Sequence, residues 1–327
     1  MKIIVGICLI LALVIPFSIG CGAGVEYKIG LSQFATHPAA DAGREGFIDA
    51  LTDAGFIEDV DVEYDFQNPE GDATVELTIA QKFVSDEVDL IFTFGTGITQ
   101  ACLTAAKSTD IPIVFCSLTD PVAAEVVSDW VHPNENITGT SDMIEVDSIV
   151  DLILQMVPGV ETLGTVYNAS EVNSVVLVDA FNDYCSELDI EVVEATVVTS
   201  ADVLTAAQSL VGRVDAIWVG TDNTVVSGLE GVLGVCEANL IPFFPSDDPS
   251  IEKGGIATLG FDYYDVGYQT GEMAVRILNG TPADEIDVEL GKTFSYSVNT
   301  AAAELYGVTI PQAILDKALN VYEELGE

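Results

Sequence analysis

The chain has 327 residues, of which 49% are hydrophobic, so it is long enough for about two domains that each bury a core. The formal net charge is −43, from 10 Lys and Arg against 53 Asp and Glu spread along the whole chain. A field of this sign repels nucleic acid and anionic lipid headgroups, and it disfavours both as binding partners.

Residues 1–20 have the pattern of an export signal. A positively charged start is followed by the apolar run 3–17, which is short for a bilayer span, and by a small residue directly before Cys21. This order resembles a lipoprotein signal, with Cys21 as the lipid-bearing first residue of the mature chain and residues 21–26 as a tether. Ser18 stands where Leu is usual, so an ordinary signal peptide or an uncleaved anchor are alternatives. The expected location is extracytoplasmic, on the outer face of the cell membrane.

Strands and helices are predicted to alternate through the first half of the mature chain. The 3.6-residue spacing of Phe47, Leu51 and Ala54 before Gly55 is typical of a helix. The predicted elements are strand Tyr27–Gln33, helix Ala39–Ala54, strand Val60–Phe66, helix Thr74–Val84, a strand within Val88–Gly97, helix Ile98–Ala106, strand Ile111–Ser117 and strand Asn136–Ser141. This rhythm predicts a parallel sheet with right-handed crossovers.

The second half repeats the alternation. Its predicted elements are helix Val146–Met156, strand Leu163–Tyr167, helix Val175–Glu187, strand Glu191–Val197, helix Ala201–Leu210, a strand within Val214–Thr224, helix Thr224–Ala238, strands Pro242–Ser246 and Ile256–Phe261, helix Tyr264–Leu278, a strand or two from Ile286 and a final helix Gln312–Leu325. A last helix after both repeats must pack on one of them, so the chain is expected to cross between them more than once.

Three strand-plus-polar-end units recur in the same order, roughly 125 to 135 residues later in the chain. The paired segments are Ile29–Pro38 with Leu163–Ser174, Val88–Gly97 (VDLIFTFGTG) with Val214–Thr224 (VDAIWVGTDNT), and Ile111–Pro121 with Ile241–Pro249. Self-similarity at this period predicts two similar lobes rather than a solenoid. The expected fold is therefore α/β, with two Rossmann-like lobes that contain parallel sheets and are joined by a multi-strand hinge.

The expected lobes are discontinuous in sequence. Residues 27–142 plus about 263–283 are assigned to the N-terminal lobe, and residues 143–262 plus about 284–327 to the C-terminal lobe. The crossings are placed near Asp142, near Asp262 and in the 280s.

Polar residues follow the apolar strands of both halves. In an open α/β sheet ligands lie outside the carboxyl ends of the strands, so two facing lobes would line the two walls of one cleft. The predicted first wall is Ser32, Gln33, Phe34, Thr96, Gly97, Ser117, Thr119 and Asp120. The predicted second wall is Tyr167, Asn168, Asn173, Ser174, Thr221, Asn223, Ser246 and Asp247. For each Ser, Thr, Asp or Asn, helix capping is the competing role.

The predicted walls contain hydroxyls, amides, aromatic rings and carboxylates but no Arg or Lys. Ser and Thr hydroxyls and backbone N–H groups at helix starts would hold a ligand carboxylate. An ammonium group would be held by Asp247 or Asp120. Phe34 and Tyr167 could stack on a flat ligand side chain.

Catalytic, metal and cofactor motifs are absent from the sequence, which has no GxSxG, HExxH, Walker or GxGxxG motif. No enzyme activity, metal or cofactor is therefore expected, although a cleft hydrolase that uses Asp120 and Asp247 is an alternative. His37 follows a strand end, and both a functional and a turn-stabilising role are open for it.

Four cysteines follow Cys21, and none has CxxC spacing. Cys102, Cys116, Cys185 and Cys236 fall in apolar contexts and are expected to be buried as small hydrophobic residues. A disulfide between Cys102 and Cys116 is the alternative.

The chain resembles the ABC-transporter substrate-binding lipoproteins of the tryptophan and tyrosine type over about residues 27–310. The strings that carry the resemblance are IGLSQFATHPAADAGREGF, QNPEGD, AQKF, VDLIFTFGTG, TDPV, NITGTSDM, YNASEVNSV, QSLVGRVDAIWVGTDNTVVS and GFDYYDVGYQTGEMA. The resemblance implies a type I periplasmic-binding fold, ligand capture by lobe closure and delivery to an ABC permease in the membrane. The protein is expected to be a monomer.

One stretch departs from the family pattern. Residues 95–99 read GTGIT, where relatives tend to have a Pro-Ala-Ala-like stretch. An aromatic amino acid is the favoured ligand, with a nucleoside or a branched-chain amino acid as alternatives. A repressor built on the same two lobes is disfavoured by the export signal and by the lack of a basic helix-turn-helix.

Overall fold

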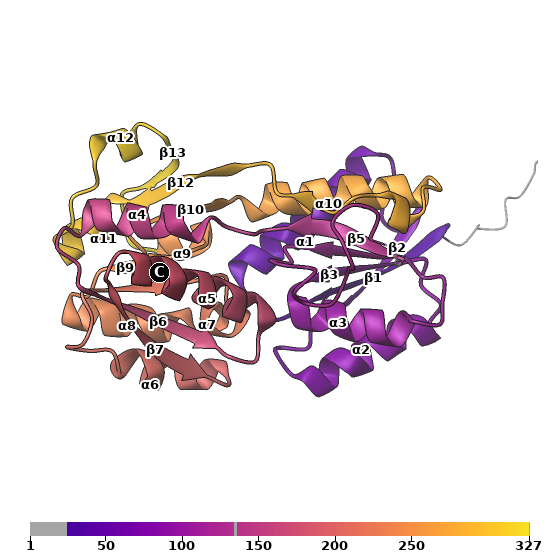
Figure 1. Ribbon diagram of the computed structural model, residues 1–327. Coiled ribbons are helices and arrows are strands. Elements are labelled where there is room, and N and C mark those ends of the chain that lie inside the picture. Colours follow the sequence, from indigo (N-terminus) through magenta and orange to yellow (C-terminus); the bar gives the residue numbers. More distant parts are fainter. Residues whose placement is uncertain (1–24, 134–135, 327) are drawn as a thin grey trace, which may run out of the picture.

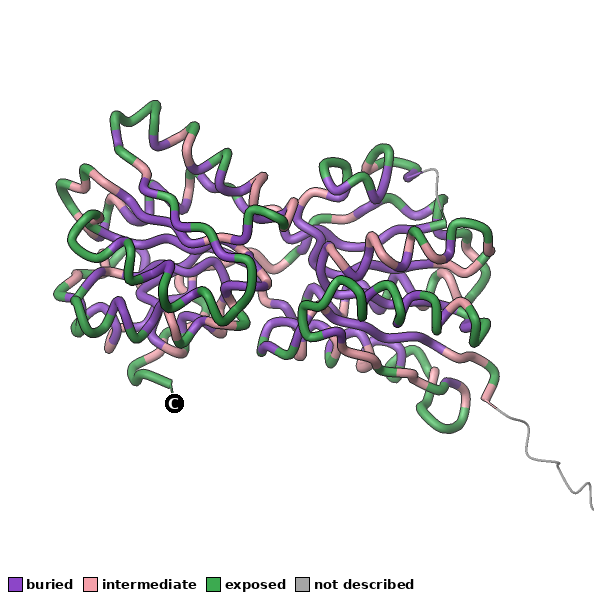
Figure 2. The backbone as a smooth tube through the Cα atoms, turned by 90° about the horizontal axis from the view of Figure 1, so that it is seen from below, coloured by how far each residue is buried: buried purple, intermediate pink, exposed green. Residues whose placement is uncertain are grey.

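The computed structural model describes residues 25–133 and 136–326, and these form two α/β lobes that lie side by side (Figure 1). The predicted signal peptide, Cys21 and the tether up to residue 24 lie outside the described residues. Buried positions follow the central strands and the inner faces of the helices in both lobes, which meet at a narrow waist (Figure 2). One cluster of buried hydrophobic residues runs from the first lobe, where it includes Ile29 and Phe47, into the second, where it includes Trp218. Another cluster, which includes Phe83 and Phe115, lies within the first lobe.

The first lobe contains a parallel sheet in the order β11-β5-β4-β3-β1-β2. Its strands are β1 (Tyr27–Gln33), β2 (Val62–Gln67), β3 (Leu90–Phe94), β4 (Ile113–Cys116), β5 (Ile137–Ser141) and β11 (Glu289–Leu290), and its helices are α1 (Pro38–Asp53), α2 (Ala73–Ser85), α3 (Thr96–Ala106) and α10 (Tyr263–Leu278). Helices α1 and α10 cover one face and α2 and α3 the other (Figure 1). With both faces covered, every residue of β3 and β4 is buried, which explains their continuous apolar runs.

Helix α10 follows a strand of the second lobe but packs on α1 in the first. The two helices approach closely because glycines lie at the contact: a Cβ atom on Gly267 would overlap the backbone of Gly43, and one on Gly46 would overlap the backbone of Tyr264. The amphipathic pattern of α10 is thus explained by its packing, because its apolar face is buried against the first lobe although the strand before it belongs to the second.

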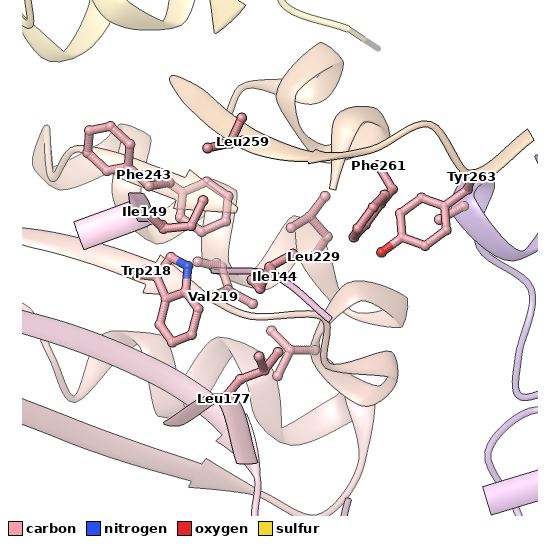
Figure 3. Packing of buried hydrophobic residues seen from close by; sticks show 14 of the residues in the cluster. Ile144, Ile149, Leu177, Trp218, Val219, Leu229, Phe243, Leu259, Phe261 and Tyr263 are labelled. Carbon is pink, nitrogen blue, oxygen red and sulfur yellow. The ribbon is translucent and has the colours of Figure 1, made fainter. Parts of the chain in front are cut away.

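The second lobe has a parallel sheet in the order β7-β6-β8-β9, followed by a sheet in the order β10-β12-β13. Its strands are β6 (Thr162–Asn168), β7 (Glu191–Val197), β8 (Ala216–Val219), β9 (Phe243–Pro245), β10 (Ala257–Phe261), β12 (Phe294–Asn299) and β13 (Ala318–Tyr322), and its helices are α4 (Val146–Met156), α5 (Val172–Glu187), α6 (Val203–Gln208), α7 (Asn223–Ser227), α8 (Leu229–Asn239), α9 (Asp248–Lys253), α11 (Thr300–Tyr306) and α12 (Gln312–Leu315). Trp218 lies in the core of this lobe among Ile149, Leu177 and Val219 (Figure 3). It stacks on Phe181 with 4.5 Å between the ring centroids, and its Nε1 donates to Ser246 Oγ at 3.0 Å.

The chain passes between the lobes after β5, after β10 and after β11. The first two passages lie at Asp142 and Asp262, near the predicted positions. The third lies later than expected, because β11 pairs in parallel with β5, Glu289 opposite Thr140, in the first sheet. The assignment of residues from about 284 to the second lobe therefore needs correction: this sheet extends to Leu290.

Two helix predictions are wrong. In place of a final helix Gln312–Leu325 there is the single turn α12 and then β13, which pairs in parallel with β12. Pairing with a neighbouring strand overrides the local helical preference there. The predicted helix Thr224–Ala238 is divided into α7 and α8 at Gly228, where the chain runs so close to Ser200 that a Cβ atom would lie 2.7 Å from its carbonyl oxygen. Among the described residues, no helix has the length and apolarity needed to cross a membrane.

Candidate functional site

A cavity lies between the lobes at the carboxyl ends of their strands. The first lobe and the two nearby crossings contribute His37, Ala39, Phe94, Thr96, Ser117, Thr119, Asp142 and Tyr263, and the second lobe contributes Asn173, Thr221, Asp222, Asn223, Val226 and Asp247. Its volume is about 20 Å³, enough for one water molecule. The lobes meet directly at its edge, where the hydroxyl oxygens of Thr119 and Thr221 are 3.4 Å apart.

The structure brings seven of the predicted wall residues together around this cavity. They are Thr96, Ser117, Thr119, Asn173, Thr221, Asn223 and Asp247. Six of them come from both members of two repeated strand-end pairs, and Asn173 comes from the third pair, so these matching strand ends face one another across the cavity.

An adjoining chamber shares Thr96 and Asn173 with the cavity and has a volume of about 340 Å³, within the range of ligand pockets. Three more predicted residues line it, namely Phe34, Gly97 and Asn168. Glu76 of α2 and Glu171, the residue before α5, face it from opposite lobes. The cavity and the chamber both lie between the lobes, and Thr96 and Asn173 separate one from the other.

The other predicted residues line neither space. They are Ser32, Gln33, Asp120, Tyr167, Ser174 and Ser246. Asp120 accepts hydrogen bonds of 3.0 Å from the backbone N–H groups of Val122 and Ala123, which is a turn-capping role. The Tyr167 hydroxyl donates to Glu194 at 2.7 Å.

Asp142 and Tyr263 belong to the cavity but were not among the predicted site residues. Asp142 is buried at the first crossing, where it accepts hydrogen bonds from the hydroxyls of Thr119 at 2.8 Å and Tyr263 at 3.1 Å. Burial raises the pKa of Asp142 above its ordinary value. The signal that could have found them is their place at the crossings, because crossings run past the cleft in a two-lobed fold.

Asp222 and Asp247 cap helices and line the cavity at the same time. Asp222 accepts from the N–H groups of Val225 at 2.8 Å and Asn168 at 2.6 Å, and Asp247 accepts from Ser250 N at 2.9 Å and Oγ at 2.7 Å. Burial raises the pKa of Asp247, and burial together with the charge of Glu171 raises that of Asp222 to about 7. Helix capping and cleft lining, which the sequence predicts as competing roles, therefore occur together in these two residues.

His37 offers a hydrogen-bond donor to the cavity. It is the N-cap of α1, where Nδ1 accepts from Ala40 N at 3.3 Å. Burial lowers the pKa of His37 to about 4, so the ring is neutral at pH 7 and its proton is on Nε2. Nε2 is buried and has no hydrogen-bond partner within the described residues.

Asn173 supplies the complementary acceptor. Its Nδ2 donates to the carbonyl oxygen of Thr221 at 2.8 Å, while Oδ1 is buried without a partner in the described part of the chain. Ser117 lines the wall opposite with a left-handed backbone (φ 56°), a conformation that costs a non-glycine residue energy and often marks a functional position.

The charge of this site is one-sided. Neither Lys nor Arg lines the cavity or the chamber, as far as the described residues go, and their carboxylates come from both lobes. No group of three His, Cys, Asp or Glu residues suited to a metal ion occurs in the described ranges. Cys102, Cys116, Cys185 and Cys236 are free and buried, so the alternative Cys102–Cys116 disulfide is not formed.

Two α/β lobes that close on one cavity define a two-lobed binding protein. The model of the family described as "ABC transporter substrate binding protein" matches residues 28–322, and the chain belongs to this family. Substrate-binding proteins of ABC importers work outside the cytoplasm together with their transporter, which is the function expected from the sequence.

Two similar proteins have an aromatic amino acid in their descriptions. A tyrosine-binding protein of Clostridioides difficile is 40% identical over 263 residues, which are 80% of this chain and 76% of that protein. A solved structure from Streptococcus pneumoniae in complex with L-Trp is 33% identical, covers 90% of this chain and 99% of its own, and has a TM-score of 0.86.

The arrangement of the lobes corresponds to a closed form. The ligand-free, open structure of a substrate-binding protein from Clostridium difficile is 38% identical and covers 92% of this chain and 100% of its own, yet its TM-score is 0.69. The tryptophan complex has lower identity but superposes better. In this structure the lobes touch across the cleft, where the hydroxyl oxygens of Thr119 and Thr221 are 3.4 Å apart.

Proposed function

We propose that this protein captures an aromatic α-amino acid, tyrosine or tryptophan, between its lobes and presents it to an ABC permease. The observation that carries the proposal is a pair of buried, unpartnered polar atoms on two residues that line one cavity, the donor His37 Nε2 and the acceptor Asn173 Oδ1. A zwitterionic head group needs both a donor and an acceptor. The ligands named for the two relatives support the choice of an aromatic side chain.

The proposed head-group site uses no cationic side chain. The ligand ammonium would lie in the cavity beside Asn173 and the carboxylates of Asp142 and Asp247. The lobes would have to separate slightly to admit the head group, because the cavity has room for one water molecule as it stands. The ligand carboxylate would accept from His37 Nε2 and from the hydroxyls of Thr96 and Ser117. We place the ligand side chain in the chamber, since the cavity alone is too small for a ring.

A titration of the mature protein, freed of co-purified ligand by unfolding and refolding, tests the proposal. Tyrosine and tryptophan should raise the unfolding midpoint, whereas leucine and adenosine should leave it unchanged. Thr96→Val, which removes a hydroxyl shared by cavity and chamber, should weaken binding, and Tyr167→Phe is the matched control because Tyr167 lines neither space. If only leucine or adenosine raised the unfolding midpoint, the ligand would instead be a branched-chain amino acid or a nucleoside.

The hydrolase alternative needs two carboxylates at one substrate. Of the proposed pair, Asp247 lines the cavity, whereas Asp120 caps a turn outside it. We therefore favour binding without turnover. Release of product from a bound ester, amide or glycoside, lost in Asp247→Asn, would reverse this choice.

We also propose that export and lipid attachment at Cys21 place a monomer on the outer face of the cell membrane, by the signal pattern of residues 1–20. Cys21→Ser should release the protein into the soluble extracytoplasmic fraction. Light scattering of the mature chain should give the mass of one copy.

A further inference from the structure

Among the described residues that line the cleft, Glu76 is the one acidic residue whose chemistry the head-group site leaves unexplained. It lies in the first turn of α2, it is 6% exposed, and its Oε1 has no hydrogen-bond partner among the described residues. The other chamber carboxylate, Glu171, is fully engaged, because it accepts from the backbone N–H and side chain of both Asn223 and Thr224 at 2.6 to 3.1 Å.

Glu76 lines the chamber, close to a residue that the chamber shares with the cavity. Thr96 lines both spaces, and the next residue, Gly97, lies against the Glu76 carboxyl group, so closely that a Cβ atom on Gly97 would be 2.8 Å from Oε1. Phe34 borders the same passage, with its ring 3.3 Å from the position of a Cβ atom on Gly71. A flat ring that enters from the cavity would therefore pass Thr96 beside Phe34 and end at Glu76.

A buried carboxyl group without a partner is costly, and a ligand that supplies a hydrogen-bond donor removes that cost. A phenol O–H or an indole N–H is such a donor at the far end of an aromatic ring, whereas a phenyl ring has none. We propose that Glu76 is a specificity-determining residue, which accepts a hydrogen bond from the ring of the ligand and so selects tyrosine and tryptophan over phenylalanine. This inference rests on the proposed function.

The discrimination follows from what phenylalanine would leave behind. Its ring would exclude water from the chamber without replacing the hydrogen bond, so Glu76 would be desolvated and unpaired. Sites built to bond a polar group reject the analogue that lacks it by large factors, and we expect phenylalanine to bind at least about 10-fold more weakly than tyrosine.

Calorimetric titration of tyrosine, tryptophan and phenylalanine into the mature protein and three variants tests the inference. Glu76→Leu should abolish the preference by weakening tyrosine and strengthening phenylalanine. Glu76→Gln keeps an acceptor oxygen and should retain most of the preference. Gly97→Ala keeps the Glu76 carboxyl group, but the added methyl group would displace it. This variant should therefore lower the preference, and it tests the inference even if Glu76→Leu fails to fold.

The outcomes separate the two proposals. If the unaltered protein binds none of the three amino acids, the proposed function fails and this inference with it. If it binds tyrosine and tryptophan but the ratio to phenylalanine stays the same in Glu76→Leu and Gly97→Ala, the function stands and Glu76 has no part in selection. A preference lost equally in Glu76→Gln and Glu76→Leu would also overturn the acceptor role.

Discussion

The two walls of the cleft differ in how far their polar groups are already satisfied. On the second lobe, Asn168 donates to Asp222 and to Thr224, and Thr224 in turn donates to Glu171. These hydrogen bonds link the polar groups of the second wall in one network. On the first lobe, His37 Nε2 and Glu76 Oε1 are buried without partners in the described ranges. We infer that the second wall is rigid before the ligand binds. Most of the unpaired hydrogen-bonding atoms available to the ligand are then on the first wall, and Asn173 Oδ1 is the one on the second among the described residues.

The largest effect is expected when the second wall loses Glu171. Glu171→Ala would leave four donors of Asn223 and Thr224 without their acceptor, and we expect the free energy of unfolding to fall by about 3 kcal/mol. Glu171→Gln retains one acceptor oxygen and should lose about half of that. Urea unfolding measures both. A loss within the error for Glu171→Ala would mean that the second wall is not held by this network.

The first wall should respond to pH in the opposite sense from a paired carboxylate. Burial, and then the charges of Glu171 and Asp72, raise the pKa of Glu76 to about 7, above the ordinary 4.5. The folded protein therefore holds a proton that the unfolded chain releases, so this contribution to the free energy of unfolding falls as the pH rises from about 4.5 to about 7 and is constant above that.

The measurement compares unfolding free energies of Glu76→Gln and the unaltered protein across that window. The variant should gain relative stability as pH rises, by about 2 kcal/mol after allowance for water in the chamber. The difference isolates Glu76 from Asp222, whose pKa is also raised to about 7. In Glu171→Gln the pH range over which the difference changes should be narrower, because one of the charges that raise the pKa of Glu76 is gone. A difference that does not change with pH would mean that Glu76 is hydrated when the lobes are closed.

Substitution of His37 separates its two nitrogens. Asn is a good N-cap, so His37→Asn should keep the bond to Ala40 N while it removes the donor at Nε2. We expect the unfolding midpoint to stay the same and tyrosine to bind about 10-fold more weakly, the loss of one buried hydrogen bond. His37→Ala should lose the cap as well, at about 1 kcal/mol of stability. Equal affinity in both variants and the unaltered protein would remove His37 from the site.

The repeat in the sequence predicted the architecture because strand order and polar strand ends are local features. It could not place α10 on α1. That packing depends on the close approach of Gly43 and Gly267, which are 224 residues apart in sequence (267 − 43). Residues at strand ends, such as Thr96 and Thr221, were predicted for the same local reason. Glu76 was missed because it lies in a helix and follows no strand. Asp142 was missed because the strand before it, β5, is not one of the repeated units.

The smallest effect is expected at Ser117, where backbone strain and ligand contact compete. Its φ of 56° is a conformation that glycine adopts freely and that costs other residues about 1 kcal/mol. Ser117→Gly should therefore be neutral to slightly stabilising in urea, and should weaken tyrosine binding because a cavity hydroxyl is lost. Ser117→Ala is the matched variant: it loses the same hydroxyl and keeps the strain, so the two should bind alike and differ in stability. Stronger binding in Ser117→Gly than in Ser117→Ala would show instead that strain on the first wall, not the hydroxyl, limits closure around the ligand.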